Sequence, residues 1–185
     1  IIGYGISGEL LASSLRTLSI ETVVLEMNSD NVSKGRERGD PVYYADATSE
    51  EALGHAHLES CRAVVVMIND HGATKRVLAT IDRMQVDVPV FVRTQYLAGI
   101  DDFTKFKTTG VVACELEGGL EVLSRVLRKL EVPKNLIIRE IDNARAQTID
   151  TERKFKENAL PLHEHKQLSG LLVENILLMK GSRAE

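Results

Sequence analysis

A glycine-rich turn near the start of the chain carries the clearest chemical signal in the sequence. The segment Gly3-Tyr4-Gly5-Ile6-Ser7-Gly8 fits the spacing G-x-G-x-x-G, follows the apolar run Ile1-Ile2 and opens a helical pattern. In this arrangement Gly3 permits a tight turn, Gly5 lets the backbone approach a phosphate, and Gly8 lets the helix pack closely on the strand. The helix N-terminus then offers free N–H groups to the anion, so the turn predicts a nucleotide site.

An acidic residue, Glu26, follows about twenty residues later at the end of the next β-rich run. A carboxylate at this place can accept hydrogen bonds from both ribose hydroxyls, and its charge repels a 2′-phosphate. We therefore expect NAD(H) or an adenine nucleotide (AMP, ADP or ATP) as ligand rather than NADP. The alternative is a glycine turn that serves packing alone.

No set of catalytic residues accompanies this turn. None of the four tyrosines is followed by lysine four residues later, as short-chain dehydrogenases require. His163 and His165 can share one face of a strand, but no further Cys or His lies near them, so a solvated loop is the better explanation. We predict no catalytic residue, no metal site and no enzymatic activity. The alternative is an NAD-dependent oxidoreductase or another Rossmann-fold enzyme fragment.

Short apolar runs alternate with helical patterns through the first half of the chain. The expected strands are residues 1–2, 22–26, 42–45, 63–68, 88–93 and 111–112. The expected helices are residues 8–18, 29–38, 49–57, 72–85, 96–107, 117–130 and 134–157. Continuous apolar strands joined through helices predict the α/β class, with a doubly wound, Rossmann-like parallel sheet. Helices and a small further element are expected to follow the sheet.

The composition argues against a nucleic-acid-binding protein and against a membrane-spanning segment. The chain has 185 residues, 43% of them hydrophobic, and a formal net charge of −4, so no general positive field attracts nucleic acid. Cys61 and Cys114 have no paired spacing and are expected to be reduced thiols. No apolar run approaches the ~20 residues of a membrane-spanning helix. The chain opens directly in a strand, and we expect it to be part of a longer polypeptide.

Beyond the glycine turn and Glu26, several blocks resemble one family. Ala45-Asp46-Ala47-Thr48, Ala63-Val64-Val65-Val66 and Val92-Arg93 stand in the order and spacing of the RCK/KTN (TrkA-N) domains. These are regulatory domains of potassium channels, Trk/Ktr uptake systems and Kef-like cation:proton antiporters. Residues 110–120 resemble the segment that leads into the family's dimer-crossing helix, in a form similar to the Kef-like branch. Residues 168–185 resemble the entry of its small C-terminal domain.

The resemblance implies a role for each matching residue. The nucleotide-binding set is Gly3, Gly5, Ile6, Ser7, Gly8, Glu26, Met27, Asp46, Ala47, Met67, Ile68, Asn69 and Arg93. The glycine turn would approach phosphate, Glu26 would hold ribose, and Asp46 with Ala47 would border adenine. Residues 67–69 would line the cleft across from the turn, and Arg93 would approach phosphate or a partner subunit.

Each role has a plainer alternative. Asp46 can cap the helix that begins near Ser49, Asn69 can be a turn residue, and Arg93 can form a structural ion pair. Glu115 and Glu117 can bind a divalent ion or simply be solvated at a helix start. The sequence also departs from the family pattern, with Ile6 where many relatives have arginine and Ala45 where glycine is usual.

These observations predict three parts and one function. Residues 1–113 are expected to form the nucleotide-binding domain, 114–158 the crossover and linker helices, and 159–185 the start of a C-terminal element. The function implied is a cytoplasmic nucleotide sensor at the inner face of the cell membrane, controlling a cation channel or antiporter in the same or another polypeptide. A homodimer, or a higher assembly of RCK domains, is expected through apolar stripes in residues 96–158. The stripes comprise Leu120, Leu123, Val126, Leu127 and Leu130, then Ile137, Ile141 and Ala144.

Overall fold

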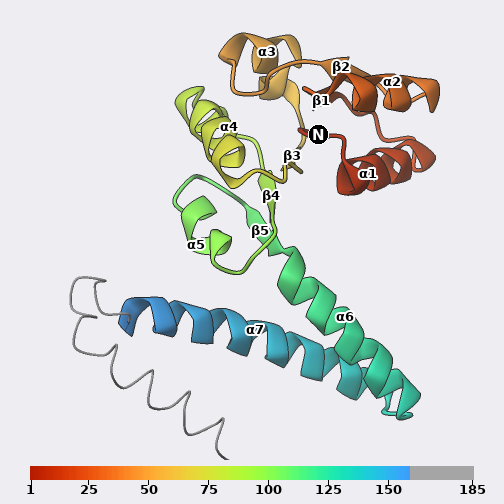
Figure 1. Ribbon diagram of the computed structural model, residues 1–185, viewed down its shortest axis with the longest axis vertical. Coiled ribbons are helices and arrows are strands. Elements are labelled where there is room, and N and C mark those ends of the chain that lie inside the picture. The colour runs from red at the N-terminus through yellow and green to blue at the C-terminus, as the bar shows by residue number, and fades with distance from the viewer. Residues whose placement is uncertain (159–185) are drawn as a thin grey trace, which may run out of the picture. The chain divides into compact units, whose positions relative to one another are not determined.

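The computed structural model describes residues 1–158, of which residues 1–145 form one compact unit (Figure 1). The helices are α1 (Ile6–Thr17), α2 (Ser29–Glu37), α3 (Glu50–His55), the short 3-10 helix η1 (Leu58–Ser60), α4 (His71–Arg83), α5 (Gly99–Phe103), α6 (Cys114–Lys129) and α7 (Lys134–Asn158). The strands are β1 (Val24–Glu26), β2 (Val42–Tyr44), β3 (Val64–Val66), β4 (Val90–Thr94) and β5 (Gly110–Ala113).

The strands are all parallel, in the order β2-β1, then Ile2, then β3-β4-β5. Ile2 forms only isolated bridges, to Leu25 on one side and Val66 on the other, so the predicted first strand is reduced to a single residue that joins the two halves. The chain runs outward from this centre in both directions. The predicted doubly wound parallel sheet is confirmed, and its reversal of direction lies between Ile2 and β3.

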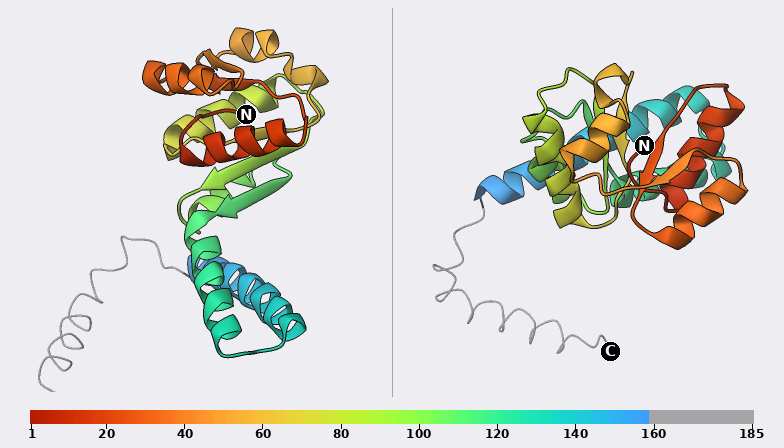
Figure 2. Two further views of the ribbon diagram at one scale, coloured as in Figure 1. Left: turned by 90° about the vertical axis from the view of Figure 1, so that its right-hand side faces the viewer. Right: turned by 90° about the horizontal axis from the view of Figure 1, so that it is seen from above.

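Helices cover both faces of the sheet, as Figure 2 shows in its view from above. On one face α1 and α2 bury a core formed by Tyr4, Ala12, Val24, Val32 and Val42. On the other face α3, α4 and α5 cover the alternate side chains of β3 and β4, and Leu53, Val77, Leu78 and Phe103 pack there. Burial of each such apolar side chain contributes roughly 1.5–3 kcal/mol, and this holds the ends of the strands in place.

Two predicted helix boundaries were wrong. The helix expected over residues 96–107 is limited to α5. Thr109 already pairs with β4, where its amide donates to Val90 O at 2.7 Å and its hydroxyl accepts from Val90 N at 3.0 Å. Helix α6 begins at Cys114 rather than near residue 117, which places Glu115 and Glu117 in its first turn. Carboxylates are favourable there because the helix dipole is positive at that end.

The helices that follow the sheet pack on each other over part of their surface. Ile137 is buried, and Arg145 donates to both carboxylate oxygens of Glu117 at 3.0 Å. Val122, Val126 and Leu130 stay largely exposed along one side of α6. Within residues 1–158, no helix combines the length and the apolar character that crossing a membrane requires.

Candidate functional site

A cavity of about 340 Å³ lies at the carboxyl ends of the strands, where the direction of the sheet reverses. Its walls come from the glycine turn, the ends of β1, β2 and β3, the first turn of α2 and the first two turns of α4. The lining residues are Ile2, Gly3, Gly5, Leu25, Glu26, Met27, Asn31, Ala45, Asp46, Ala47, Thr48, Met67, Ile68, Asn69, Ala73, Arg76 and Val77.

The glycine turn has the conformation that its spacing predicts. Gly3 has φ of +99°, which side-chain-bearing residues rarely adopt, and a Cβ on Gly8 would lie 2.1 Å from the Gly3 carbonyl oxygen. A Cβ on Gly5 would meet nothing within 4 Å, so the space beside Gly5 is open toward the cavity. The turn therefore requires glycine at its first and last positions for its own packing, while its middle position leaves room for a ligand.

The start of α1 leaves backbone donors available. No side chain caps this helix, and its first backbone bond runs from Glu9 N to Gly5 O at 2.9 Å. The amides of Ile6, Ser7 and Gly8 precede that bond, so they belong to the group of helix N–H donors that an anion can satisfy. The Ile6 side chain is 90% exposed, so Ile6 offers its backbone amide to an anion at the start of α1.

The glycine turn is anchored on both sides. Glu26 accepts a hydrogen bond from Tyr4 N at 2.6 Å and another from Asn28 N at 2.7 Å. The buried Tyr4 hydroxyl donates to Asp40 at 2.5 Å, and burial together with this bond raises the pKa of Tyr4 to about 12. A carboxylate has about four acceptor positions, so Glu26 can still receive a hydrogen bond on each oxygen. Glu26 thus holds the turn and keeps capacity for ribose hydroxyls.

Asp46 organises the turn after β2 rather than capping α3. Its Oδ1 accepts from Thr48 N at 2.9 Å and from the Thr48 hydroxyl at 2.7 Å, and these bonds lower the pKa of Asp46. Ser49 is the N-cap of α3 and accepts from Ala52 N. The alternative that Asp46 caps α3 is therefore wrong. Asp46 instead stabilises a turn that places Asp46 and Ala47 at the cavity.

Arg93 lies beside the cavity without lining it. Its Nη1 donates to Asn69, its Nη2 to Gln95 at 3.0 Å and its Nε to the Cys114 sulfur at 2.9 Å. Within the described chain these partners are all uncharged, so the alternative of a structural ion pair is wrong. Arg93 instead joins Asn69, which lines the cavity, to Cys114, the first residue of α6.

Most of the predicted site residues meet at this one cavity. Gly3, Gly5, Glu26, Met27, Asp46, Ala47, Met67, Ile68 and Asn69 line it, whereas Ile6, Ser7, Gly8 and Arg93 lie outside its lining. The lining residues that the sequence did not predict include Asn31, Ala73 and Arg76. The last two could have been found from helical spacing, since positions 73, 76 and 77 share one face of the helix that follows β3.

The proposed alternatives for metal binding find no support in the described part of the chain. Among residues 1–158 no group of three His, Cys, Asp or Glu side chains is placed to hold an ion. Glu117 is instead paired with Arg145. His163 and His165 lie outside the described residues.

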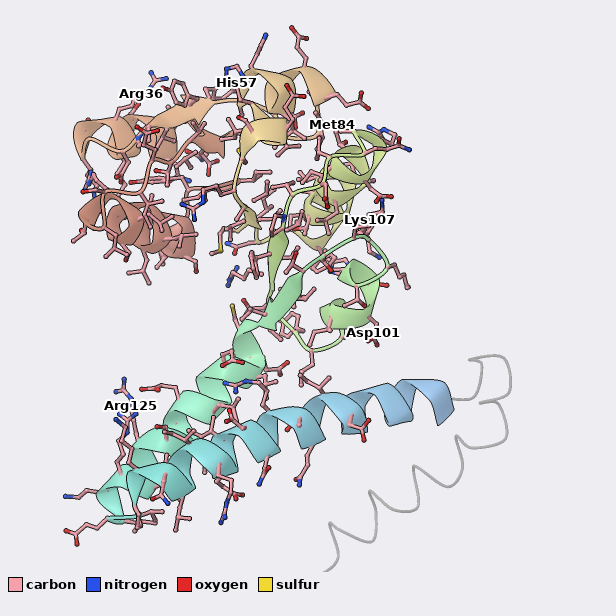
Figure 3. All side chains as sticks on the ribbon, turned by 180° about the vertical axis from the view of Figure 1, so that it is seen from behind. Arg36, His57, Met84, Asp101, Lys107 and Arg125 are labelled. Carbon is pink, nitrogen blue, oxygen red and sulfur yellow. The ribbon has the colours of Figure 1, made fainter. Side chains whose placement is uncertain are left out.

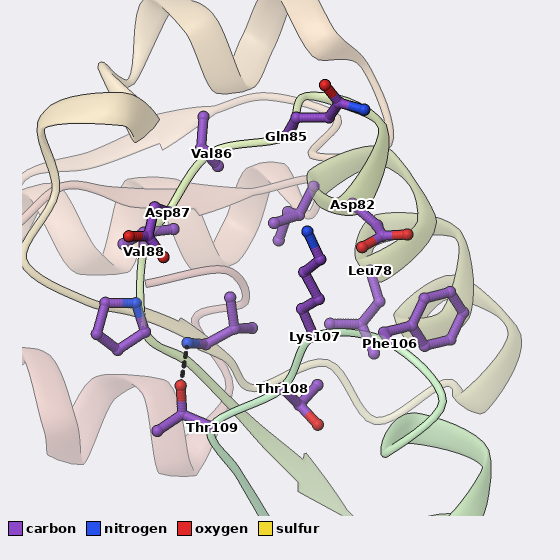
Figure 4. A pocket seen from close by; sticks show the side chains of 13 residues that line it. Leu78, Asp82, Gln85, Val86, Asp87, Val88, Phe106, Lys107, Thr108 and Thr109 are labelled. Atoms are coloured by element: carbon purple, nitrogen blue, oxygen red, sulfur yellow. Dashed lines mark hydrogen bonds between the residues drawn. The ribbon is translucent and has the colours of Figure 1, made fainter.

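A second cavity, of about 320 Å³, lies at the opposite end of the sheet (Figure 4). The Lys107 side chain reaches into it between Val86 and Asp82. Figure 3 shows Lys107 on the same side as Met84, the C-cap residue of α4. Helix carbonyls rather than helix amides therefore face this end, and they disfavour an anion. The cavity at the carboxyl ends is the better candidate for a nucleotide.

Comparisons of sequence and of structure with known proteins point to the same family. The family model described as the TrkA-N domain matches residues 1–113. The chain is 27% identical over 187 residues to a putative K(+) efflux antiporter KefB of Alkalimonas amylolytica. That alignment covers 100% of this chain and 28% of the relative, so the chain spans less than a third of that protein.

Solved structures share the architecture. The TrkA-N domain of the inner membrane protein ybaL from Escherichia coli is 27% identical, with a TM-score of 0.59 over 70% of this chain and 92% of that one. The Shewanella denitrificans Kef CTD, solved in an AMP-bound form, has a TM-score of 0.69 over 83% of this chain and 94% of its own, at 13% identity. The latter similarity establishes the fold.

Proposed function

Because the chain belongs to the TrkA-N domain family, we propose that it is a regulatory domain that senses NAD(H) or an adenine nucleotide (AMP, ADP or ATP). It controls the transport of potassium or another monovalent cation by a membrane channel or antiporter, in the same or another polypeptide, from the cytoplasmic face. The observation that carries the proposal is the meeting of the glycine turn and Glu26 at one cavity. The antiporter relative and the AMP-bound structure support the choice of system and ligand.

In the proposed complex the phosphate binds the amides at the start of α1 and the ribose binds Glu26. The base extends past Glu26 toward Asp46 and Ala47, with residues 67–69 forming the opposite wall. Arg93 contacts the wall through Asn69 rather than the phosphate. This arrangement uses the free helix donors for the anion and the remaining acceptor positions of Glu26 for the hydroxyls.

Calorimetry with NAD, NADH, AMP, ADP and ATP tests this binding. Gly5→Val is the informative variant, because a Cβ at this place meets no protein atom within 4 Å, while the branched side chain occupies the space beside the helix start. We expect it to fold normally and to lose binding. The absence of both heat and thermal shift with all five compounds at millimolar concentration would contradict the proposal.

We extend the proposal to the absence of turnover. The described side chains around the cavity hold the backbone or the ligand, and we assign no proton donor or nucleophile among them. Steady NADH oxidation with a carbonyl substrate, abolished in Gly5→Val, would instead support the oxidoreductase alternative.

The sensor is proposed to act as a homodimer through the helices that follow the sheet, with residues 1–113 as the sensing domain and residues 114–158 as the connecting helices. Leu123 and Leu127, expected at the interface, are half-buried within the chain. Val122, Val126 and Leu130 are 62%, 49% and 67% exposed and follow one another at four-residue intervals on α6. An apolar stripe of this kind is typical of an interface.

A second uncovered surface supports the dimer. Phe91 and Val112 lie on the face of β4 and β5 that α1 and α2 leave open, and both are at least 40% exposed. Sedimentation tests the assembly: Val122→Asp with Val126→Asp should give a monomer, whereas the control Arg125→Asp should leave the dimer intact. A monomeric wild type, with and without nucleotide, would rule out this assembly. In a dimer, the nucleotide can shift the arrangement only by its difference in affinity for the two states.

A further inference from the structure

Three charged side chains line the cavity at the carboxyl ends of the strands, and they differ in how they are engaged. Glu26 holds two backbone amides, and Asp46 holds Thr48. Arg76, on α4, forms no side-chain hydrogen bond or ion pair within the described chain, although its charge contributes to lowering the pKa of Asp46. Among the described residues, Arg76 is therefore the charged group of this cavity whose side chain has no protein partner.

The position of Arg76 is set by its helix. Ala73, Arg76 and Val77 fall on the face of α4 that borders the cavity. The Nη1 atom of Arg76 lies 3.5 Å from the place where a Cβ on Gly72 would stand, so the guanidinium folds back over the first turn of α4. Gly72 carries no side chain, and this leaves room for the planar group beside the end of β3.

The order of groups along the cavity indicates which part of a nucleotide reaches Arg76. The glycine turn binds phosphate at one end, and Glu26 marks the ribose. Residues 45–48 follow β2, which lies beyond β1 in the sheet, and the charge of Arg76 acts on Asp46 in that segment. A base that extends from the ribose thus enters between the Asp46 turn and α4.

We propose that Arg76 is a specificity-determining residue whose guanidinium lies flat against a purine base in this cavity. The inference rests on the proposed nucleotide binding and adds the residue that recognises the base. A guanidinium is planar and weakly hydrated, so it stacks on aromatic rings, and the positive charge adds a cation–π attraction. A purine offers the larger ring surface, whereas a ligand without a base gains nothing from this contact.

The test compares AMP with ribose 5-phosphate, which carries the same sugar and phosphate without the base. Binding is followed by two-dimensional NMR titration, which measures weak affinities. In Arg76→Ala we expect the Kd for AMP to rise about five- to tenfold while the Kd for ribose 5-phosphate is unchanged. Arg76→Lys keeps the charge but loses the planar group, so it should resemble Arg76→Ala.

Arg83→Ala is the matched control, because Arg83 lies on the same helix and pairs with Glu50 at 3.0 Å away from the cavity. It should leave both affinities unchanged. Equal weakening of both ligands in Arg76→Ala would assign Arg76 to the phosphate, and full recovery in Arg76→Lys would assign it a charge role; either result overturns the proposal, as does an unchanged Kd for AMP. A wild-type chain that binds no adenine nucleotide would overturn the proposed function itself.

Discussion

A cavity lies at each end of the sheet, about 340 Å³ at the carboxyl ends of the strands and about 320 Å³ at the amino ends. Two carboxylates and one cationic side chain line each of them. At the carboxyl ends these are Glu26, Asp46 and Arg76, and at the amino ends they are Asp82, Asp87 and Lys107. Size and side-chain charge therefore do not distinguish the two cavities.

The difference lies in the backbone. The N-terminus of α1 borders the first cavity with amides that no side chain caps, whereas the C-terminus of α4 borders the second. The helix dipole places about half a positive charge at the former and half a negative charge at the latter. The winding of a parallel α/β sheet thus decides which end can bind an anion, before side chains refine the choice.

We expect the largest effect from a substitution in the glycine turn, which sets the difference between the two cavities. In Gly8→Ala the new Cβ would lie 2.1 Å from the Gly3 carbonyl oxygen, so α1 must move away from the turn. We expect the free energy of unfolding, measured by urea denaturation, to fall by about 3 kcal/mol, with loss of nucleotide binding.

Gly118→Ala is the control for Gly8→Ala. Gly118 lies within α6, where an added Cβ would meet nothing within 4 Å. It should stabilise the chain by about 0.5–1 kcal/mol through helix propensity. Similar effects of the two substitutions would show that the turn is not the constrained element described above.

Charge reversal at each end separates the two cavities directly. Glu26→Lys removes the acceptor for Tyr4 N and for ribose, and should weaken nucleotide binding by about 1–3 kcal/mol in calorimetry. Asp87→Lys makes the same charge change at the amino-end cavity and should leave the affinity unchanged. Equal losses would mean that long-range charge, rather than the local site, governs binding.

Tyr4→Phe tests the hydrogen bond from the Tyr4 hydroxyl to Asp40, which holds the glycine turn in place. It leaves buried Asp40 without its hydroxyl partner, and should cost about 1–2 kcal/mol of stability at pH 7. Because the pKa of Tyr4 is raised to about 12, an unfolded chain loses this proton near pH 10 while the folded chain keeps it. The wild-type stability should therefore fall as pH rises from 10 to 12, and urea denaturation should show Tyr4→Phe lacking that part of the decline.

The parts of the site that could be predicted from the sequence are those that depend on backbone conformation and on residues close together in the chain. Gly3, Gly8 and Glu26 act through the turn and the end of a strand, and these features follow from spacing along the chain. Strand ends within one parallel sheet also meet at one edge, and residues 67–69 accordingly line the same cavity as the glycine turn.

The parts that sequence missed depend on the choice of partner across space. Arg93 could face a phosphate, a subunit or an acid, and only the fold shows that it bonds Asn69, Gln95 and Cys114. Arg76 lies on the cavity side of α4 because of how that helix packs on the sheet, and residue propensity does not encode this packing. Side-chain partners separated by twenty or more residues are set by packing, which local patterns do not encode.

The smallest expected effect on stability comes from a cluster of charged and polar side chains around Asp102, which joins α4 to α5. Asp102 accepts from Lys75 at 2.7 Å, from Lys105 at 2.9 Å and from His71 at 3.1 Å, and the bond from Lys75 is the largest cause that lowers the pKa of Asp102. The carboxylate is about one-third exposed, so solvent screens these pairs. Asp102→Asn should therefore lower the free energy of unfolding at pH 7 by only about 0.5–1 kcal/mol.

The pH dependence gives that small effect a distinct signature. A depressed folded-state pKa stabilises the chain above the unfolded value of about 3.9, and the contribution is lost as pH falls below it. Urea denaturation at pH 7, 5 and 3 should show the gap between wild type and Asp102→Asn closing toward pH 3. Glu50→Gln is the control, since the pair of Glu50 with Arg83 is more exposed and should contribute less. A gap that stays constant down to pH 3 would mean that Asp102 acts through packing, because the ammonium groups of Lys75 and Lys105 stabilise the ionised form of the carboxylate.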